Sequence, residues 1–149
     1  MEIVLATLAD AANTSSDGKL NLMGLFDTLY AGAMPVTHPS MQLVLRIRAE
    51  PSETDRQHEL EIRCMDEDGQ ELFKVTGGFS VQAPPGKAAT FNHVVGISNL
   101  TFQKYGGYTF PIFINRDLKR TVELDVMKAE GPTDPPRPTP PPTGASARS

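Results

Sequence analysis

The sequence predicts an all-β protein, built as an antiparallel sandwich of two sheets with seven to nine strands. Two observations support this prediction. Apolar residues recur at every second position in four separate segments, with charged, amide or hydroxyl side chains between them, as is typical of strands with one buried face. Short runs of turn-forming residues, such as Asp66-Glu67-Asp68-Gly69 and Asn115-Arg116-Asp117, separate the segments and can close hairpins between antiparallel strands.

The first two expected strands are the least regular. Residues 3–12 are apolar on both faces, which indicates an interior strand, although residues 6–12 could also form a short helix. A polar turn at residues 13–18 leads to a second run at residues 20–30. Gly24 lies in the middle of that run, where it predicts a bulge or a bend at which the chain changes sheets.

The middle of the chain contains two of the four alternating segments, residues 41–49 and residues 58–64. Each places its apolar residues on one face, so each is expected to be a half-buried strand. Proline-bearing loops are expected at residues 31–39 and 83–89.

Glycines interrupt the two runs that follow the second of these strands. Residues 71–75 and 79–82 flank Gly77-Gly78, which predicts a kink between two short strands. Residues 91–97 alternate less clearly, and the pattern indicates a shift of register around Gly96.

Two alternating strands, residues 108–114 and 122–126, are expected to close the sandwich as its final hairpin. Pro111 lies inside the first of them. Because proline has no backbone N–H to donate to a neighbouring strand, we expect this position at a sheet edge or at a bulge.

Length and composition divide the chain of 149 residues into one domain and a tail. Residues 1–128 are enough for one two-sheet core. Residues 129–149 contain no Val, Ile, Leu, Met or aromatic residue, so we expect a disordered Pro-rich C-terminal tail. Its P-x-x-P spacing, through Pro135 and Pro138, could support weak docking in an aromatic groove, although a spacer is the more common use of such segments.

Charge and cysteine content argue against several classes of function. The net charge is −4 and no basic stripe is visible, which argues against nucleic-acid binding. The single cysteine, Cys64, precludes an intrachain disulfide and a zinc site built from several cysteines. The first apolar run follows no positive segment and stops at Asp10, so we expect no signal peptide, no membrane span and a cytoplasmic location.

The acidic turn is the best candidate for a metal site. Asp66, Glu67 and Asp68 could offer carboxylates to calcium at one end of the sandwich, as in membrane-binding C2 domains. Such a site needs a second acidic loop, and its possible sources are Asp10, Asp17 and Asp27. The same turn is also ordinary hairpin chemistry, and we favour that structural interpretation.

No catalytic or cofactor-binding constellation is evident. The three histidines, His38, His58 and His93, lack metal-ligand spacing, and His58 is expected to be a hydrogen-bonded residue at the rim of the core. Cys64 follows an inward alternation, so we expect it to be buried, with a raised pKa, and inert.

Some apolar residues point away from the expected core. Phe113, Met127, Leu29 and Val44 fall on the opposite face of their strands. If that face is exposed, it would suit a partner protein or a second copy of the chain. The alternative is that a loop or the tail covers it.

Two resemblances add to this interpretation. The pattern Leu100-x-Phe102 followed by Gly106-x-Tyr108-x-Phe110 resembles a corner of immunoglobulin-like domains, which implies that the Tyr108 hydroxyl bonds back to the preceding turn. The absence of tryptophan and of a cysteine pair excludes an antibody-type domain.

The second resemblance covers most of residues 1–128. The opening Met1-Glu2-Ile3-Val4-Leu5-Ala6-Thr7-Leu8-Ala9-Asp10-Ala11-Ala12, with residues 18–27 and 65–69, resembles a family of uncharacterised bacterial proteins. This resemblance implies a bacterial, cytoplasmic β-sandwich and supplies no activity.

The function expected from the sequence is a non-enzymatic protein-interaction or assembly module, which binds another protein or itself. The alternative is a calcium- or lipid-dependent C2-like module that uses the turn from Asp66 to Asp68. A hydrolase with a site assembled from scattered loops is the least favoured hypothesis.

Overall fold

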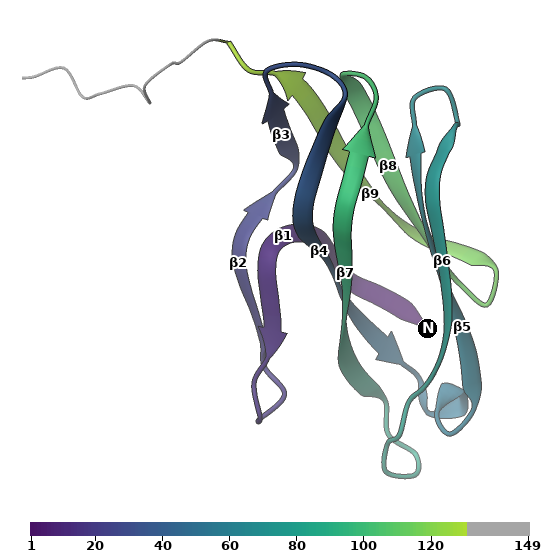
Figure 1. Cartoon of the computed structure of the whole chain (residues 1–149). Coiled ribbons are helices and arrows are strands. Elements are labelled where there is room, and N and C mark those ends of the chain that lie inside the picture. The colour runs from purple at the N-terminus through teal and green to yellow at the C-terminus, as the bar shows by residue number, and fades with distance from the viewer. Residues whose placement is uncertain (131–149) are drawn as a thin grey trace, which may run out of the picture.

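The computed structural model describes residues 1–130, and it confirms the all-β prediction (Figure 1). Nine strands and one short 3-10 helix follow one another along the chain. The strands are β1 (Glu2–Thr14), β2 (Leu20–Phe26), β3 (Thr28–Ala31), β4 (Val36–Ala49), β5 (Gln57–Asp66), β6 (Glu71–Ser80), β7 (Ala89–Phe102), β8 (Gly106–Ile114) and β9 (Asp117–Lys128), and the helix η1 is Pro51–Glu53.

The strands form two sheets that pack face to face. The four-stranded sheet has the order β2-β1-β4-β7, and the five-stranded sheet has the order β3-β9-β8-β5-β6. All neighbours are antiparallel except β3 and β9, which are parallel. The predicted two-sheet sandwich is therefore confirmed, and β6 and β7 are edge strands of different sheets.

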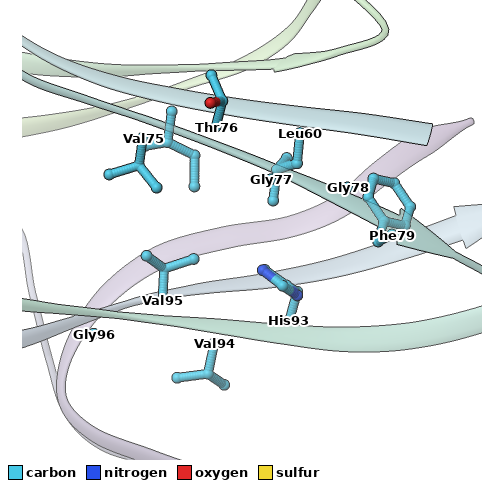
Figure 2. A pocket seen from close by; sticks show the side chains of 11 residues that line it. Leu60, Val75, Thr76, Gly77, Gly78, Phe79, His93, Val94, Val95 and Gly96 are labelled. Carbon is cyan, nitrogen blue, oxygen red and sulfur yellow. The ribbon is translucent and has the colours of Figure 1, made fainter. Parts of the chain in front are cut away.

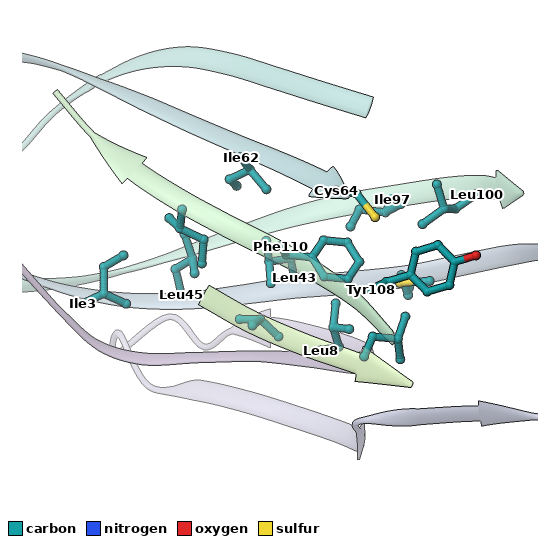
Figure 3. Packing of buried hydrophobic residues seen from close by; sticks show 14 of the residues in the cluster. Ile3, Leu8, Leu43, Leu45, Ile62, Cys64, Ile97, Leu100, Tyr108 and Phe110 are labelled. Atoms are coloured by element: carbon teal, nitrogen blue, oxygen red, sulfur yellow. The ribbon is translucent and has the colours of Figure 1, made fainter. Parts of the chain in front are cut away.

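The core lies between the sheets, where the four predicted apolar stripes meet (Figure 3). Leu43, Leu45 and Ile47 of β4 are completely buried, and Phe110 and Ile112 of β8 face them from the other sheet. Phe102 and Tyr108 pack edge to face with ring centroids 4.8 Å apart. Burial of each such side chain contributes about 1.5–3 kcal/mol, so the alternating pattern determines which faces close on each other.

The chain passes from one sheet to the other after Gly24, the position at which the sequence predicted the change. Residues 3–12 form a strand, as one of the two alternatives predicted. Gly24 has a φ of 69°, but β2 keeps the same register with β1 on both sides of it, so the predicted bulge is wrong. The change of sheet itself occurs at Asp27, between β2 and β3.

Two further predicted irregularities at glycines are wrong. β6 runs without a break through Gly77 and Gly78, which pair with Leu60 and Glu59 of β5. β7 keeps its register with β4 through Gly96. Pairing to a regular neighbouring strand outweighs the weak strand preference of glycine at these positions.

Pro111 lies in a central strand, so its predicted position at a sheet edge is wrong. β8 has β9 on one side and β5 on the other. The pairing of β8 with β5 passes from Ile112 directly to Thr109, and a register shift relative to β9 follows Ile112. The ladder is thus interrupted next to the residue that lacks an N–H, as the alternative prediction of a bulge implied.

Candidate functional site

The carboxylates of the acidic turn form hydrogen bonds and ion pairs with other groups of the protein. Asp66 Oδ1 accepts the backbone N–H groups of Asp68 and Gln70, each at 2.9 Å. The Lys104 ammonium lies 3.6 Å from Asp66 Oδ2 and also contacts the Asp68 carboxylate. The backbone N–H of Gln70 makes the largest contribution that lowers the pKa of the Asp66 carboxyl group below its usual value. The backbone N–H of Asp68 and the positive charge of Lys104 lower it further.

Lys104 connects this turn to the corner between β7 and β8. The Tyr108 hydroxyl donates a hydrogen bond to the Lys104 carbonyl at 2.7 Å, which is the contact that the immunoglobulin-like resemblance predicted. Glu67 accepts the Gly107 N–H on the same side of the turn. The turn thus has ordinary hairpin chemistry, as its structural interpretation predicted, and its three acidic residues also link the hairpin to the neighbouring corner.

Within residues 1–130, no group of three or more His, Cys, Asp or Glu side chains is placed to hold a metal ion. The proposed second acidic loop does not assemble with the turn in this part of the chain. A calcium site here would have to displace Lys104 from Asp66 and Asp68. The calcium hypothesis stays a prediction, and a melting temperature measured with calcium and with a chelator is its direct test.

His58 is a structural residue with both ring nitrogens occupied. Nε2 lies 2.6 Å from the Glu53 carbonyl, and Nδ1 lies 2.9 Å from the Asn115 side-chain nitrogen. Asn115 Oδ1 accepts the Glu59 N–H, so the Asn115 amide group must donate to Nδ1. His58 therefore donates through Nε2 and joins β5 to the final turn, which confirms that it is hydrogen-bonded, and the side chain is buried.

Cys64 is completely buried, as predicted. Desolvation, with a smaller contribution from the Asp66 charge, raises the pKa of its thiol to about 12. The thiol is therefore protonated at neutral pH and is a small apolar group of the core.

The predicted second apolar face does not form one patch. Val44 is completely buried in the four-stranded sheet, and Leu29 packs partly against the core. Phe113 lies under Arg63, whose guanidinium carbon is 5.0 Å from the ring centroid. Of these four residues, Met127 alone is about half exposed, at 51%.

The best candidate for a binding site is a groove along the open side of the sandwich, between the edge strands β6 and β7 (Figure 2). Two cavities of about 300 and 550 Å³ share Val75, Val95 and Gly96, and together they form this groove. Its floor includes Leu60 and Ile62 of β5. The other lining residues are Leu72, Phe73, Thr76, Gly77, Gly78 and Phe79 on the β6 side and His93, Val94, Ile97, Ser98, Asn99, Leu100, Thr101 and Gln103 on the β7 side.

None of the residues that line the groove is Asp, Glu, Lys or Arg. His93 is its one titratable side chain, and burial lowers the pKa of its imidazole. The groove therefore suits an uncharged ligand that makes apolar contacts and hydrogen bonds. Both walls are sheet edges, so alternate backbone groups of each strand have no strand to pair with in the described part of the chain.

Sequence reasoning missed the groove, because it depends on which two strands end up as edges. One signal was present in the sequence: residues 89–102 contain neither a charged residue nor a proline. Edge strands of soluble proteins usually carry such residues, which discourage pairing with other chains.

Residues 4–127 match a family of unknown function, DUF6941. The chain belongs to this family. The resemblance to an uncharacterised family that the sequence suggested is therefore confirmed. No curated protein matches this DUF6941 member.

Among solved structures, a β-glucuronidase from glycoside hydrolase family 2 is similar to part of this DUF6941 member. The match has 18% identity and a TM-score of 0.35, and it covers 63% of this chain and 10% of that chain. The chain thus corresponds to a small part of the length of that enzyme.

Two further predictions concern a membrane span and the C-terminal tail. No helix within residues 1–130 is long and apolar enough to cross a membrane. The predicted P-x-x-P segment with Pro135 and Pro138 lies outside the described residues, as does all but the first two residues of the predicted tail at 129–149.

Proposed function

We propose that this protein is a non-enzymatic binding module that accepts an extended, uncharged polypeptide segment along the open β6–β7 side. The observation that carries the proposal is the coincidence of an uncharged apolar groove with two sheet edges. An added strand would gain backbone hydrogen bonds from an edge, and its alternate side chains would enter the groove. Sequence preference would then come from the groove, since the backbone contacts are the same for any extended segment.

The groove residues support this mode of binding rather than catalysis. His93 is the only side chain along the groove that could act as a general base, and no acidic residue lies in the lining to orient it. His58 already uses both ring nitrogens, and the Cys64 thiol is buried and protonated. The setting that we propose is the bacterial cytoplasm, which is compatible with a lone reduced cysteine.

Selection from a library of random linear peptides tests the proposal without a known partner. Peptides of about a dozen residues are long enough to extend along the groove. We expect the wild-type chain to enrich peptides with uncharged, alternating apolar residues. Their affinity is then measured by fluorescence anisotropy at low protein concentration.

A pair of matched variants locates the binding site. Val75→Lys places a charge in the groove at a side chain that is 46% exposed, so the fold should tolerate it. Leu118→Lys makes the same kind of change at a 57% exposed residue of β9, outside the groove. The selected peptides should lose at least about tenfold in affinity for Val75→Lys and keep their affinity for Leu118→Lys. Enrichment no better than background, or equal binding to both variants, would refute the proposed function.

A further inference from the structure

β7 is the longest unprotected edge in the described part of the chain. Its 14 residues, Ala89–Phe102, include no charge and no proline, and it has β4 as its only strand neighbour. β2, the other edge of the same sheet, has 7 residues. A long, uncharged edge is a feature that natural proteins avoid unless another element covers it.

We infer that the strand that covers β7 is the β7 of a second copy of this chain, antiparallel to it across a two-fold axis at Val95. This inference rests on the proposed function, because it names the occupant of the same open side. In a two-fold contact, each residue meets the residue that lies equally far on the other side of the axis. A charge near the axis would therefore meet itself, and β7 carries none.

The order of residues along β7 gives pairs of uncharged residues on both faces of such a contact. Around Val95, Val94 opposes the Gly96 of the second copy, and Asn92 opposes its Ser98 on the outer face. His93 opposes its Ile97 on the groove side, which places the neutral imidazole against an apolar side chain.

Beyond Ser98, a strict pairing would place the inward-facing Phe91 of the second copy opposite Asn99. One unpaired residue in the strand is needed there, so that inward-facing side chains of the two copies oppose each other. Asn99 supplies it, with a φ of 54° and no partner in the β4 ladder. Phe91, which packs partly on the core, then opposes the buried Leu100, and Thr90 opposes Thr101. At these two positions an apolar residue meets an apolar residue and a hydroxyl residue meets a hydroxyl residue.

The size of the contact predicts a weak dimer. A strand of this length is about 48 Å long and a sheet is about 10 Å thick, so the edge covers roughly 480 Å² on each copy. Stable dimers bury about 800 Å² on each copy. Contacts at the groove wall, where Phe73 and the exposed Val75 lie, would add to this area, and we expect a dissociation constant on the order of 100 µM.

The C-terminal segment is a poorer occupant of this edge. The described part of the chain ends beside β3, where the Ala129 N–H donates to the Ala31 carbonyl. β3 and β6 are at opposite ends of the five-stranded sheet. The segment also contains seven prolines between residues 131 and 142 and no large apolar residue, so it has few backbone donors and nothing to fill the groove.

Sedimentation equilibrium of the full chain from about 1 to 500 µM tests the inference. We expect a monomer–dimer equilibrium for the wild type. Val95→Lys should abolish dimers, because two ammonium groups would meet at the axis. Val95→Glu should do the same, and a mixture of the two variants should regain the dimer. Ser98→Lys, at an exposed residue, should weaken association at least about tenfold even if the Val95 variants do not fold, because a lysine on an edge strand opposes pairing with another strand.

Thr121→Lys, at an exposed position of β9, is the matched control and should dimerise like the wild type. A wild-type monomer at every concentration would overturn the inference, and so would a dimer that Ser98→Lys leaves unchanged. If such a monomer still binds the selected peptides, only the inference fails and the proposed function stands. If it binds none, both fail.

Discussion

The Tyr108 hydroxyl joins the final strands to the corner that precedes them. The side chain is only 2% exposed, and its hydroxyl satisfies the Lys104 carbonyl. Tyr108→Phe removes the donor and leaves that carbonyl without this partner, which should lower the free energy of unfolding by about 1–3 kcal/mol. Urea denaturation measures the difference. Tyr30→Phe, at a residue that is 68% exposed, should have no effect, and an equal loss in both variants would contradict the role assigned to the Tyr108 hydroxyl.

The charge of Asp66 makes a pH-dependent contribution to stability. Because the pKa of its carboxyl group is lower in the folded chain than its ordinary value of 3.8, ionised Asp66 favours folding. This contribution is complete above the unfolded pKa and disappears as the pH falls through the folded pKa.

Asp66→Asn keeps an acceptor for the turn amides and removes the charge that faces Lys104. The variant should be less stable than the wild type at pH 7, and the difference should shrink as the pH falls below 3.8. Denaturation at a series of pH values measures it. A difference that stays constant down to the most acidic point would show that the charge is not responsible.

At the scale of the element, the final hairpin contains a local conflict between sequence and backbone. Asn115 and Arg116 both have positive φ, at 52° and 71°, and form the two-residue turn between β8 and β9. Such turns favour glycine at the second position. Arg116→Gly should therefore raise the free energy of unfolding by about 0.5–1 kcal/mol, since the relief at positive φ exceeds the cost of a more flexible unfolded chain.

Glu123→Gly, at an exposed position that is regularly paired with Thr109 of β8, is the control for this substitution. It lies in β9, where glycine offers no relief and weakens the strand, so it should destabilise the chain by about 0.5–1 kcal/mol. Thermal melts of both variants give the comparison. A loss of stability in Arg116→Gly would contradict the description of the turn.

The strands show which features the sequence could predict. The stripes at residues 41–49, 58–64, 108–114 and 122–126 predicted the core, because burial on one face leaves a local pattern with a period of two. Gly77-Gly78 and Pro111 misled the prediction, because pairing with neighbouring strands overrides the local preference of a single residue. The acidic turn was predicted as a turn, but Lys104, which neutralises it, lies 36 residues further along the chain from Asp68.

At the scale of the whole molecule, the groove could not be predicted, because no local pattern shows which strands become edges. β6 and β7 are consecutive in the chain, and yet they end different sheets. The chain leaves one sheet after β6 and enters the other with β7 (Figure 1), and the groove lies between these two edge strands. The absence of charge along β7 acquires meaning only once that position is known.

Hydrogen exchange of the wild-type chain, resolved by residue, tests most directly whether the β7 edge is a pairing surface. The experiment compares low protein concentration with concentrations on the order of hundreds of micromolar, and with saturating selected peptide. Our account predicts that alternate amides of β7, those that face away from β4, become protected at high concentration or with peptide, while the amides of β2 do not change. Exchange in β7 that stays the same under all three conditions would contradict it.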